Sequence, residues 1–172
     1  MKIKIKKLND NAVYPTYATD GSAGIDLTVV SHKVDKYGCD VYGTSLAVAI
    51  PSGYVGLIFP RSSVAKKQQR LTNCVGVIDS DYRGEIMLKF KPDCVSANPF
   101  KIWLKNFSWF KRLFKRTSNQ EVVYTRNTDC SYKIGERAAQ MIIVRIPKIV
   151  WEDVDDLGDT ERGDGGYGHT GD

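Results

Sequence analysis

The sequence predicts an all-β fold in a single domain, and two observations support this. Short β-branched or aromatic runs alternate with turns rich in glycine and proline, and no helical periodicity is visible before residue 99. Many short strands separated by frequent turns are typical of a β-sandwich or β-barrel. The 172 residues are enough for one domain with a sizeable hydrophobic core.

The expected strands follow one another at short intervals. Residues 1–6 alternate Ile3 and Ile5 with lysines, which is the period of two residues that a strand with one buried face requires. Further runs of strand-like composition cover residues 27–30, 46–50, 54–59, 75–78, 86–90 and 141–146.

Residues 93–133 differ from the rest of the chain. Phe100, Trp103, Phe107, Phe110 and Phe114 recur at helical spacing with basic residues between them, which predicts an amphipathic basic helix near 98–118. This segment holds five more basic than acidic residues, which equals the formal net charge of the whole chain, +5. Since two strands of a hairpin are usually joined by about 2–5 residues, we interpret 93–133 as an insertion.

The sequence leaves the role of this insertion open. An aromatic stripe at helical spacing usually packs on the protein's own barrel or on a neighbouring subunit. An apolar patch rimmed by Lys and Arg also suits a protein groove, an anionic membrane surface or nucleic acid.

The chain becomes acidic after Trp151 and ends in the glycine-rich stretch RGDGGYGHTGD at 162–172. Such a sequence cannot form a packed core alone. We expect residues 159–172 to be either a disordered tail or a flexible arm that orders over an anionic ligand, since glycine lets main-chain N–H groups approach phosphate closely.

Composition excludes several classes of protein. No run approaches the roughly 18–20 apolar residues of a membrane helix, and the N-terminus MKIKIKK lacks the apolar core of a signal peptide. With two histidines and no CxxC pair, a zinc site is not expected. We expect an intracellular, cytoplasmic protein.

Five short segments carry the functional information: AGIDL at 23–27, PRSS at 60–63, NCVGVIDSDYRGE at 73–85, GERAAQ at 135–140 and RGDGGYGHTG at 162–171. Each resembles one of the five motifs of the trimeric dUTP diphosphatase (dUTPase) family, in the family's order. The resemblance covers residues 1–92 and 134–172. Some phage members carry an added segment between the third and fourth motifs, so the chain resembles a phage-type member, which would act in the host cytoplasm.

The resemblance implies a fold, an assembly and a reaction. The fold would be a single dUTPase-like domain over 1–172, a distorted β-barrel with jelly-roll topology. Three subunits would form a homotrimer with shared active sites. The reaction would be attack of water on the α-phosphate of dUTP, giving dUMP and pyrophosphate. This activity limits uracil incorporation into DNA and supplies dUMP for dTTP synthesis.

Hydrolysis of a triphosphate needs positive charge around the phosphates, a metal ion, and a carboxylate that orients the attacking water. The resemblance implies that Asp79 holds the attacking water and the deoxyribose 3′-hydroxyl. It implies that Gln140 contacts an α-phosphate oxygen or a metal-bound water. Arg61, Ser62 and Ser63 would meet the phosphates. Taken alone, an Asp at a turn is usually a local backbone acceptor, and an isolated RSS is a solvated loop.

The third motif would form the uracil pocket. Asn73, with main-chain groups of Gly76 and Ile78, would read uracil in a tight hairpin that has no room for the methyl group of thymine. Tyr82 would pack on the deoxyribose and exclude a ribose 2′-hydroxyl by crowding. Asp26, a buried residue, would support the site indirectly, through water to the metal.

The C-terminal arm would close the site. Arg162 would clamp the γ-phosphate and Tyr167 would stack over uracil, a place that phenylalanine often takes in the family. His169 stands where serine is usual, and Thr170 keeps a hydroxyl. Mg²⁺ would be held by the substrate phosphates and water, with no direct protein ligand.

Two other functions are considered. A dCTP deaminase shares the fold and some motif character, but it lacks the glycine-rich arm. A regulatory or binding protein would act through the basic aromatic insertion, with catalysis secondary.

Overall fold

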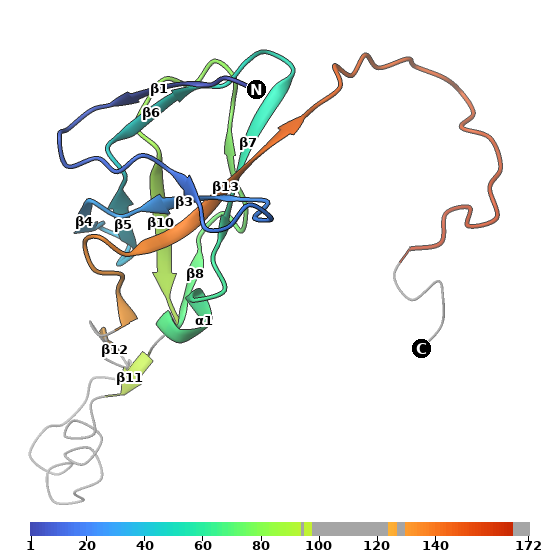
Figure 1. Ribbon diagram of the computed structural model, residues 1–172. Coiled ribbons are helices and arrows are strands. Elements are labelled where there is room, and N and C mark those ends of the chain that lie inside the picture. The colour runs from blue at the N-terminus through green and yellow to red at the C-terminus, as the bar shows by residue number, and fades with distance from the viewer. Residues whose placement is uncertain (94, 98–123, 127–129, 167–172) are drawn as a thin grey trace, which may run out of the picture.

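The computed structural model describes residues 1–93, 95–97, 124–126 and 130–166. These residues form a β-barrel-like body with one short helix (Figure 1). The elements are β1 (Lys4–Lys7), β2 (Thr16–Tyr17), β3 (Ile25–Thr28), β4 (Ser31–Val34), β5 (Asp40–Gly43), β6 (Leu46–Ala49), β7 (Tyr54–Pro60), α1 (Val64–Lys67), β8 (Gln69–Leu71), β9 (Gly76–Ile78), β10 (Met87–Pro92), β11 (Val95–Ala97), β12 (Tyr124–Arg126) and β13 (Arg137–Arg145).

Two antiparallel sheets make up most of the body. One has the strand order β2-β3-β13-β7-β9 and the other the order β4-β5-β10-β8, while β1 pairs with β6. The chain passes from one sheet to the other between β3 and β4, whereas β2 and β3 share one sheet and β4 and β5 share the other. The all-β, jelly-roll-like fold predicted from the sequence is therefore confirmed.

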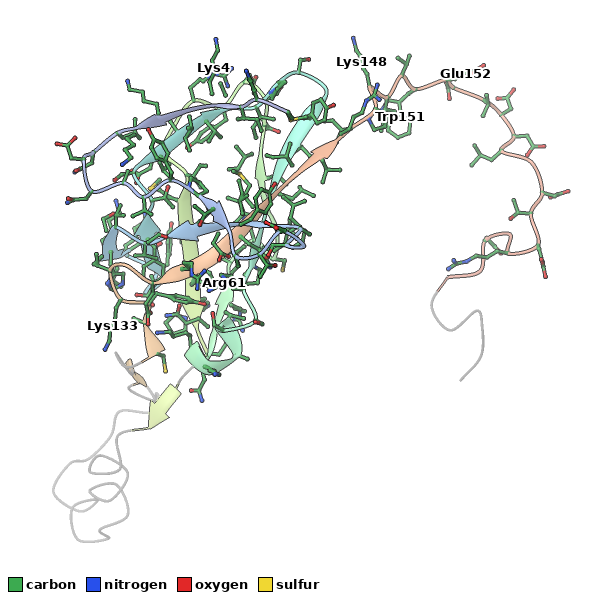
Figure 2. All side chains as sticks on the ribbon, in the orientation of Figure 1. Lys4, Arg61, Lys133, Lys148, Trp151 and Glu152 are labelled. Carbon is green, nitrogen blue, oxygen red and sulfur yellow. The ribbon has the colours of Figure 1, made fainter. Side chains whose placement is uncertain are left out.

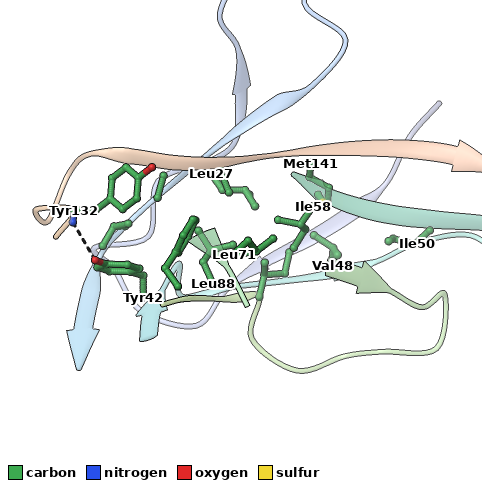
Figure 3. Close-up of a cluster of buried hydrophobic side chains, with 14 residues drawn as sticks. Leu27, Tyr42, Val48, Ile50, Ile58, Leu71, Leu88, Tyr132 and Met141 are labelled. Atoms are coloured by element: carbon green, nitrogen blue, oxygen red, sulfur yellow. Dashed lines mark hydrogen bonds between the residues drawn. The ribbon is translucent and has the colours of Figure 1, made fainter. Parts of the chain in front are cut away.

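The hydrophobic core lies between the two sheets (Figure 3). Leu27, Ile58 and Met141 come from one sheet and Tyr42 and Leu88 from the other, and each is at most 3% exposed. Burial of one such side chain contributes about 1.5–3 kcal/mol to folding. The core therefore fixes β3, β7 and β13, the three strands that carry the site described below.

Several local predictions are corrected. Each of the seven runs predicted as strands overlaps an observed strand, but β2, β4, β5, β8, β11 and β12 were not predicted, and α1 is a four-residue helix where none was expected. The tight hairpin expected around residue 79 is wrong in its pairing. β9 pairs with β7, whereas β10 pairs with β5 and β8, so the turn after β9 crosses from one sheet to the other.

The two ends of segment 93–133 come together, because β11 and β12 pair antiparallel with Val95 opposite Arg126. Residues 98–123 lie outside the described residues, so the helix near 98–118 stays a prediction.

The chain leaves the barrel after β13 (Figure 1). The main-chain N–H of Ile146 donates to Gly53 O at 2.9 Å. Beyond it, Val150, Trp151 and Leu157 are 84%, 89% and 94% exposed. Tyr167, His169 and Thr170 lie outside the described residues.

Candidate active site

A buried carboxylate holds two arginines at one end of the larger sheet. Asp26 is only 5% exposed. Its Oδ1 lies 2.8 Å from Arg61 Nε, and its Oδ2 accepts a hydrogen bond from Arg137 Nη1 at 2.9 Å. Figure 2 shows Arg61 beside β13. Charge-assisted hydrogen bonds of this kind are roughly twice as strong as neutral ones, so Asp26 fixes both guanidinium groups.

The pairing of the strands places Gln140 beside this group. Gln140 lies opposite Asp26 in β3 and opposite Phe59 in β7. A Cβ atom at Gly24 would lie 2.6 Å from Gln140 Oε1, so the glycine of the first motif leaves the space that the amide occupies. Gln140 Nε2 is 3.5 Å from Pro60 O. The structure therefore brings the first, second and fourth motifs together.

A pocket of about 300 Å³ adjoins this group, lined by Arg61, Ser63, Lys67, Tyr132, Gly135, Glu136 and Arg137. Lys67 Nζ lies 2.6 Å from Glu136 Oε2, and this hydrogen bond holds the pKa of Glu136 below its usual value. With three cationic side chains against one carboxylate on its walls, the pocket favours an anion.

Five residues of this pocket were not predicted. Gly135, Glu136 and Arg137 stand inside the GERAAQ motif, so the motif itself could have indicated them. Lys67 and Tyr132 lie outside the five motifs, and nothing in their spacing distinguished them from other surface or core residues.

The residues of the third motif form a second group around β9. Tyr82 N donates to Asp79 O at 3.2 Å, which closes a turn that presents the exposed Asp79 side chain. Tyr82 Oη donates to Glu85 O at 2.9 Å. A Cβ atom at Gly84 would lie 2.5 Å from Tyr82 Oη, so only glycine lets the tyrosine ring lie against the main chain.

Asn73 lies close to the start of β9. A Cβ atom at Gly76 would be 3.6 Å from Asn73 Nδ2 and 3.1 Å from Ile58 Cβ. In the described part of the chain β9 is the last strand of its sheet, so one row of its main-chain N–H and C=O groups has no strand partner.

One chain does not bring the two groups together. Ile78 lies opposite Gly56 in β7, so Asp79 follows at the level of Val55. Arg61 is six residues further along the chain, and at about 3.3 Å per residue this separates the two by about 20 Å. That distance is too long for both side chains to act on one phosphate group.

Residues 159–166 of the arm lie well away from both groups in this chain (Figure 1). Arg162 Nε donates to Gly165 O at 2.9 Å, and Gly163 N donates to Thr160 Oγ1 at 3.0 Å. Gly163 has a φ of +53°, which an L side chain rarely adopts.

Neither a metal cluster nor a membrane helix is found in the described ranges. No group of three or more His, Cys, Asp or Glu side chains there could hold a metal ion. The helix α1, with four residues, is far shorter than the roughly 20 residues that cross a bilayer, and no other helix there qualifies.

Comparison with known proteins identifies the family. The dUTPase family model matches residues 10–97. The deoxyuridine 5′-triphosphate nucleotidohydrolases of Hydrogenobaculum sp. and Nautilia profundicola are 36% and 38% identical to this chain, over 99% of each sequence. The solved dUTPase of Staphylococcus bacteriophage 80alpha with dUPNHPP superposes with a TM-score of 0.71 and 27% identity, over 99% of this chain and 98% of that chain. The chain belongs to the dUTPase family.

Proposed function

We propose that this chain hydrolyses dUTP to dUMP and pyrophosphate by attack of water on the α-phosphate. One observation carries the proposal: Asp26 holds Arg61 and Arg137 beside Gln140, at the meeting point of three motifs. Fixed guanidinium groups stabilise charge that develops on phosphate oxygens without having to reorganise during the reaction.

The group around Asp26 acts on the phosphates. Arg61 presents a planar set of donors that matches phosphate oxygens, and Ser62, which is exposed, adds a neutral donor. The Gln140 amide both donates and accepts, so it can bind an α-phosphate oxygen or a metal-bound water.

The group around β9 acts on the nucleoside. β9 leaves one main-chain row without a strand partner, and this supports recognition of the uracil edge by main-chain groups of Gly76 and Ile78 together with Asn73. Asp79, exposed at the start of its turn, is suited to hold the 3′-hydroxyl and the attacking water. The Tyr82 ring, fixed over Gly84, packs on the deoxyribose and excludes a 2′-hydroxyl.

A complete site needs residues from more than one copy of the chain. The separation of about 20 Å between Asp79 and Arg61 along β7 supports shared sites in a homotrimer. The exposed Val150, Trp151 and Leu157 support the same assembly, because large apolar side chains in such a row are usually covered by a partner.

The C-terminal arm, 159–172, closes over the bound nucleotide. Arg162 clamps the γ-phosphate, Tyr167 stacks on uracil, and His169 and Thr170 face the phosphates. Closure excludes water other than the attacking one, which is the usual role of a catalytic lid.

Mg²⁺ fits this site as an ion held by the substrate. Both carboxylate oxygens of Asp26 are occupied by arginines, so Asp26 is not available as a direct ligand. Gln140 would orient a water bound to the ion. When bound, Mg²⁺ neutralises charge on the phosphates.

A second role, regulation through segment 93–133, is a further candidate. The similar phage 80alpha dUTPase is described as one of the phage dUTPases that control transfer of virulence genes. In this chain the helix near 98–118 would present the aromatic face to a protein, a membrane surface or nucleic acid. Deletion of residues 98–128 tests this role: unchanged hydrolysis and trimer mass support a partner surface, and loss of the trimer contradicts it.

Release of pyrophosphate tests the proposed activity. Purified chain is assayed with dUTP, and with dTTP, dCTP and UTP as controls, with and without EDTA. The proposal expects release from dUTP alone, lost in EDTA. Ammonia release from dCTP, or no release from any nucleotide, would contradict it.

A further inference from the structure

Tyr132 is held rigidly in the core, although it lies in the loop before β13 and outside the five motifs. The residue is 3% exposed. Its ring meets Tyr42 edge-on, with centroids 5.6 Å apart and planes at 88°, and its centroid lies 5.4 Å from that of Phe90. Its main-chain N–H donates to the Tyr42 hydroxyl at 3.0 Å (Figure 3). These contacts fix the direction in which the Tyr132 hydroxyl points.

Two buried hydroxyls lie on the wall of the pocket beside Arg61 and Arg137. Within the described part of the chain, neither Tyr132 Oη nor Ser63 Oγ has a hydrogen-bond partner, and both residues line the pocket with Arg61 and Arg137. Burial raises the pKa of Tyr132, and the neighbouring Ser63 hydroxyl partly opposes this rise. Ser63 precedes α1 but makes no capping bond. Since an unpaired buried hydroxyl costs free energy, both groups need a partner when the site is occupied.

We propose that Tyr132 is a positioning residue, which donates its hydroxyl hydrogen to Ser63 Oγ when the phosphate chain binds. A serine hydroxyl has one hydrogen and two lone pairs, so accepting from Tyr132 leaves the Ser63 hydrogen free to point into the pocket. Ser63 then donates to a phosphate oxygen beside Arg61. The inference rests on the proposed function, which places Arg61 and Ser63 at the phosphates.

The proposal predicts that loss of the Tyr132 hydroxyl weakens substrate binding and leaves the chemical step nearly unchanged. Tyr132→Phe keeps the ring and its packing but removes the donor, so Ser63 loses its orientation. We expect the KM for dUTP to rise about 3- to 10-fold, which is the range of one net hydrogen bond, with kcat changed less than about 2-fold. The Kd for inorganic pyrophosphate should rise by a similar factor.

A double-mutant cycle tests the pair in the full-length chain. Tyr132→Phe, Ser63→Ala and the double variant are compared by dUTP kinetics, by calorimetry with pyrophosphate, and by thermal unfolding. The double variant should have a KM for dUTP and a Kd for pyrophosphate no higher than those of the weaker-binding single variant. Tyr37→Phe, a 69% exposed tyrosine in the turn between β4 and β5, is the matched control and should behave as wild type.

Two results would overturn the inference. One is fold-changes in KM and Kd that multiply in the double variant, which would show that the two hydroxyls act independently. The other is a Tyr132→Phe variant that loses kcat and thermal stability while both KM and Kd stay unchanged. If wild type does not hydrolyse dUTP, the proposed function fails, and the pyrophosphate Kd values decide the inference by themselves.

Discussion

Replacement of Asp26 by asparagine tests the buried carboxylate most sharply. Asp26→Asn keeps the shape of the side chain but removes the charge that two arginines share. The amide oxygen can still accept from one guanidinium, while the amide NH₂ faces the other donor. A hydrogen bond to a charged group contributes about 1.5–3 kcal/mol. The side chains of Arg61 and Arg137 are 27% and 48% exposed, so we discount the contribution of the more exposed contact, that of Arg137. We therefore expect the free energy of unfolding to fall by about 2–3 kcal/mol.

Thermal unfolding measures this loss. For a chain of this length, 1 kcal/mol corresponds to about 2–4 °C, so the Tm of Asp26→Asn should fall by about 5–10 °C. Activity should fall as well, because Arg61 is no longer oriented. The matched control is Asp93→Asn, since Asp93 and Arg70 form an exposed ion pair with side chains 42% and 63% accessible. Such pairs contribute about 0–1 kcal/mol. Equal shifts in the two variants, or none in either, would refute the reasoning.

Three further predictions follow from the site. Asp79→Asn should bind dUTP with nearly unchanged affinity but lose turnover by at least about 100-fold, the scale of general-base catalysis, so substantial residual pyrophosphate release would count against its assignment. A chain ending before Arg162 should keep its Tm, because the arm is exposed, yet hydrolyse dUTP at least about 10-fold more slowly; normal rates would show that the arm is not a lid. Lys67→Met removes the partner that lowers the pKa of Glu136. Since that pKa is depressed on folding, the pair stabilises the fold above the unfolded value near 4.5, and this is lost as the pH falls through the folded pKa. Urea unfolding should therefore show a larger difference in stability between wild type and Lys67→Met at pH 7 than at pH 3, and a difference of the same size at both pH values would contradict this.

The strands that the sequence predicted are those with apolar buried faces, such as β7. β4 was not predicted because all four of its residues are exposed, and β5 was not predicted because its buried positions include a polar group. Asp40 is fully buried, accepts from Gln69 Nε2 at 2.7 Å and contacts His32 Nε2. Hydrophobic periodicity detects apolar burial only, so a strand whose inner face binds a carboxylate has no visible pattern.

The site residues were likewise predicted only in part. The motifs predicted that Asp26 and Gln140 belong to the site, but not that Arg137 shares the carboxylate with Arg61. That contact joins β3, the end of β7 and the start of β13, which only the fold brings together. The hairpin expected around Asp79 failed for a related reason: local turn chemistry indicates a reversal of the chain, whereas strand pairing depends on the sheets that receive each strand.

Mixing two inactive variants tests most directly whether the site is assembled from different copies of the chain. Asp79→Asn disables the residues around β9 that act on the nucleoside. Arg61→Ala disables the residues around Asp26 that act on the phosphates. The two variants are unfolded together in equal amounts, refolded, and assayed for pyrophosphate release from dUTP, with each variant refolded alone as the control. If two copies build each site, a site is active when one copy supplies an intact Asp79 and the other an intact Arg61. Each of these holds in half of the sites after random mixing, so about a quarter of the sites should be active, and the mixture should recover about a quarter of the wild-type rate. A mixture as inactive as its parents, despite a trimeric mass, would show that one chain supplies both groups and would contradict the shared site.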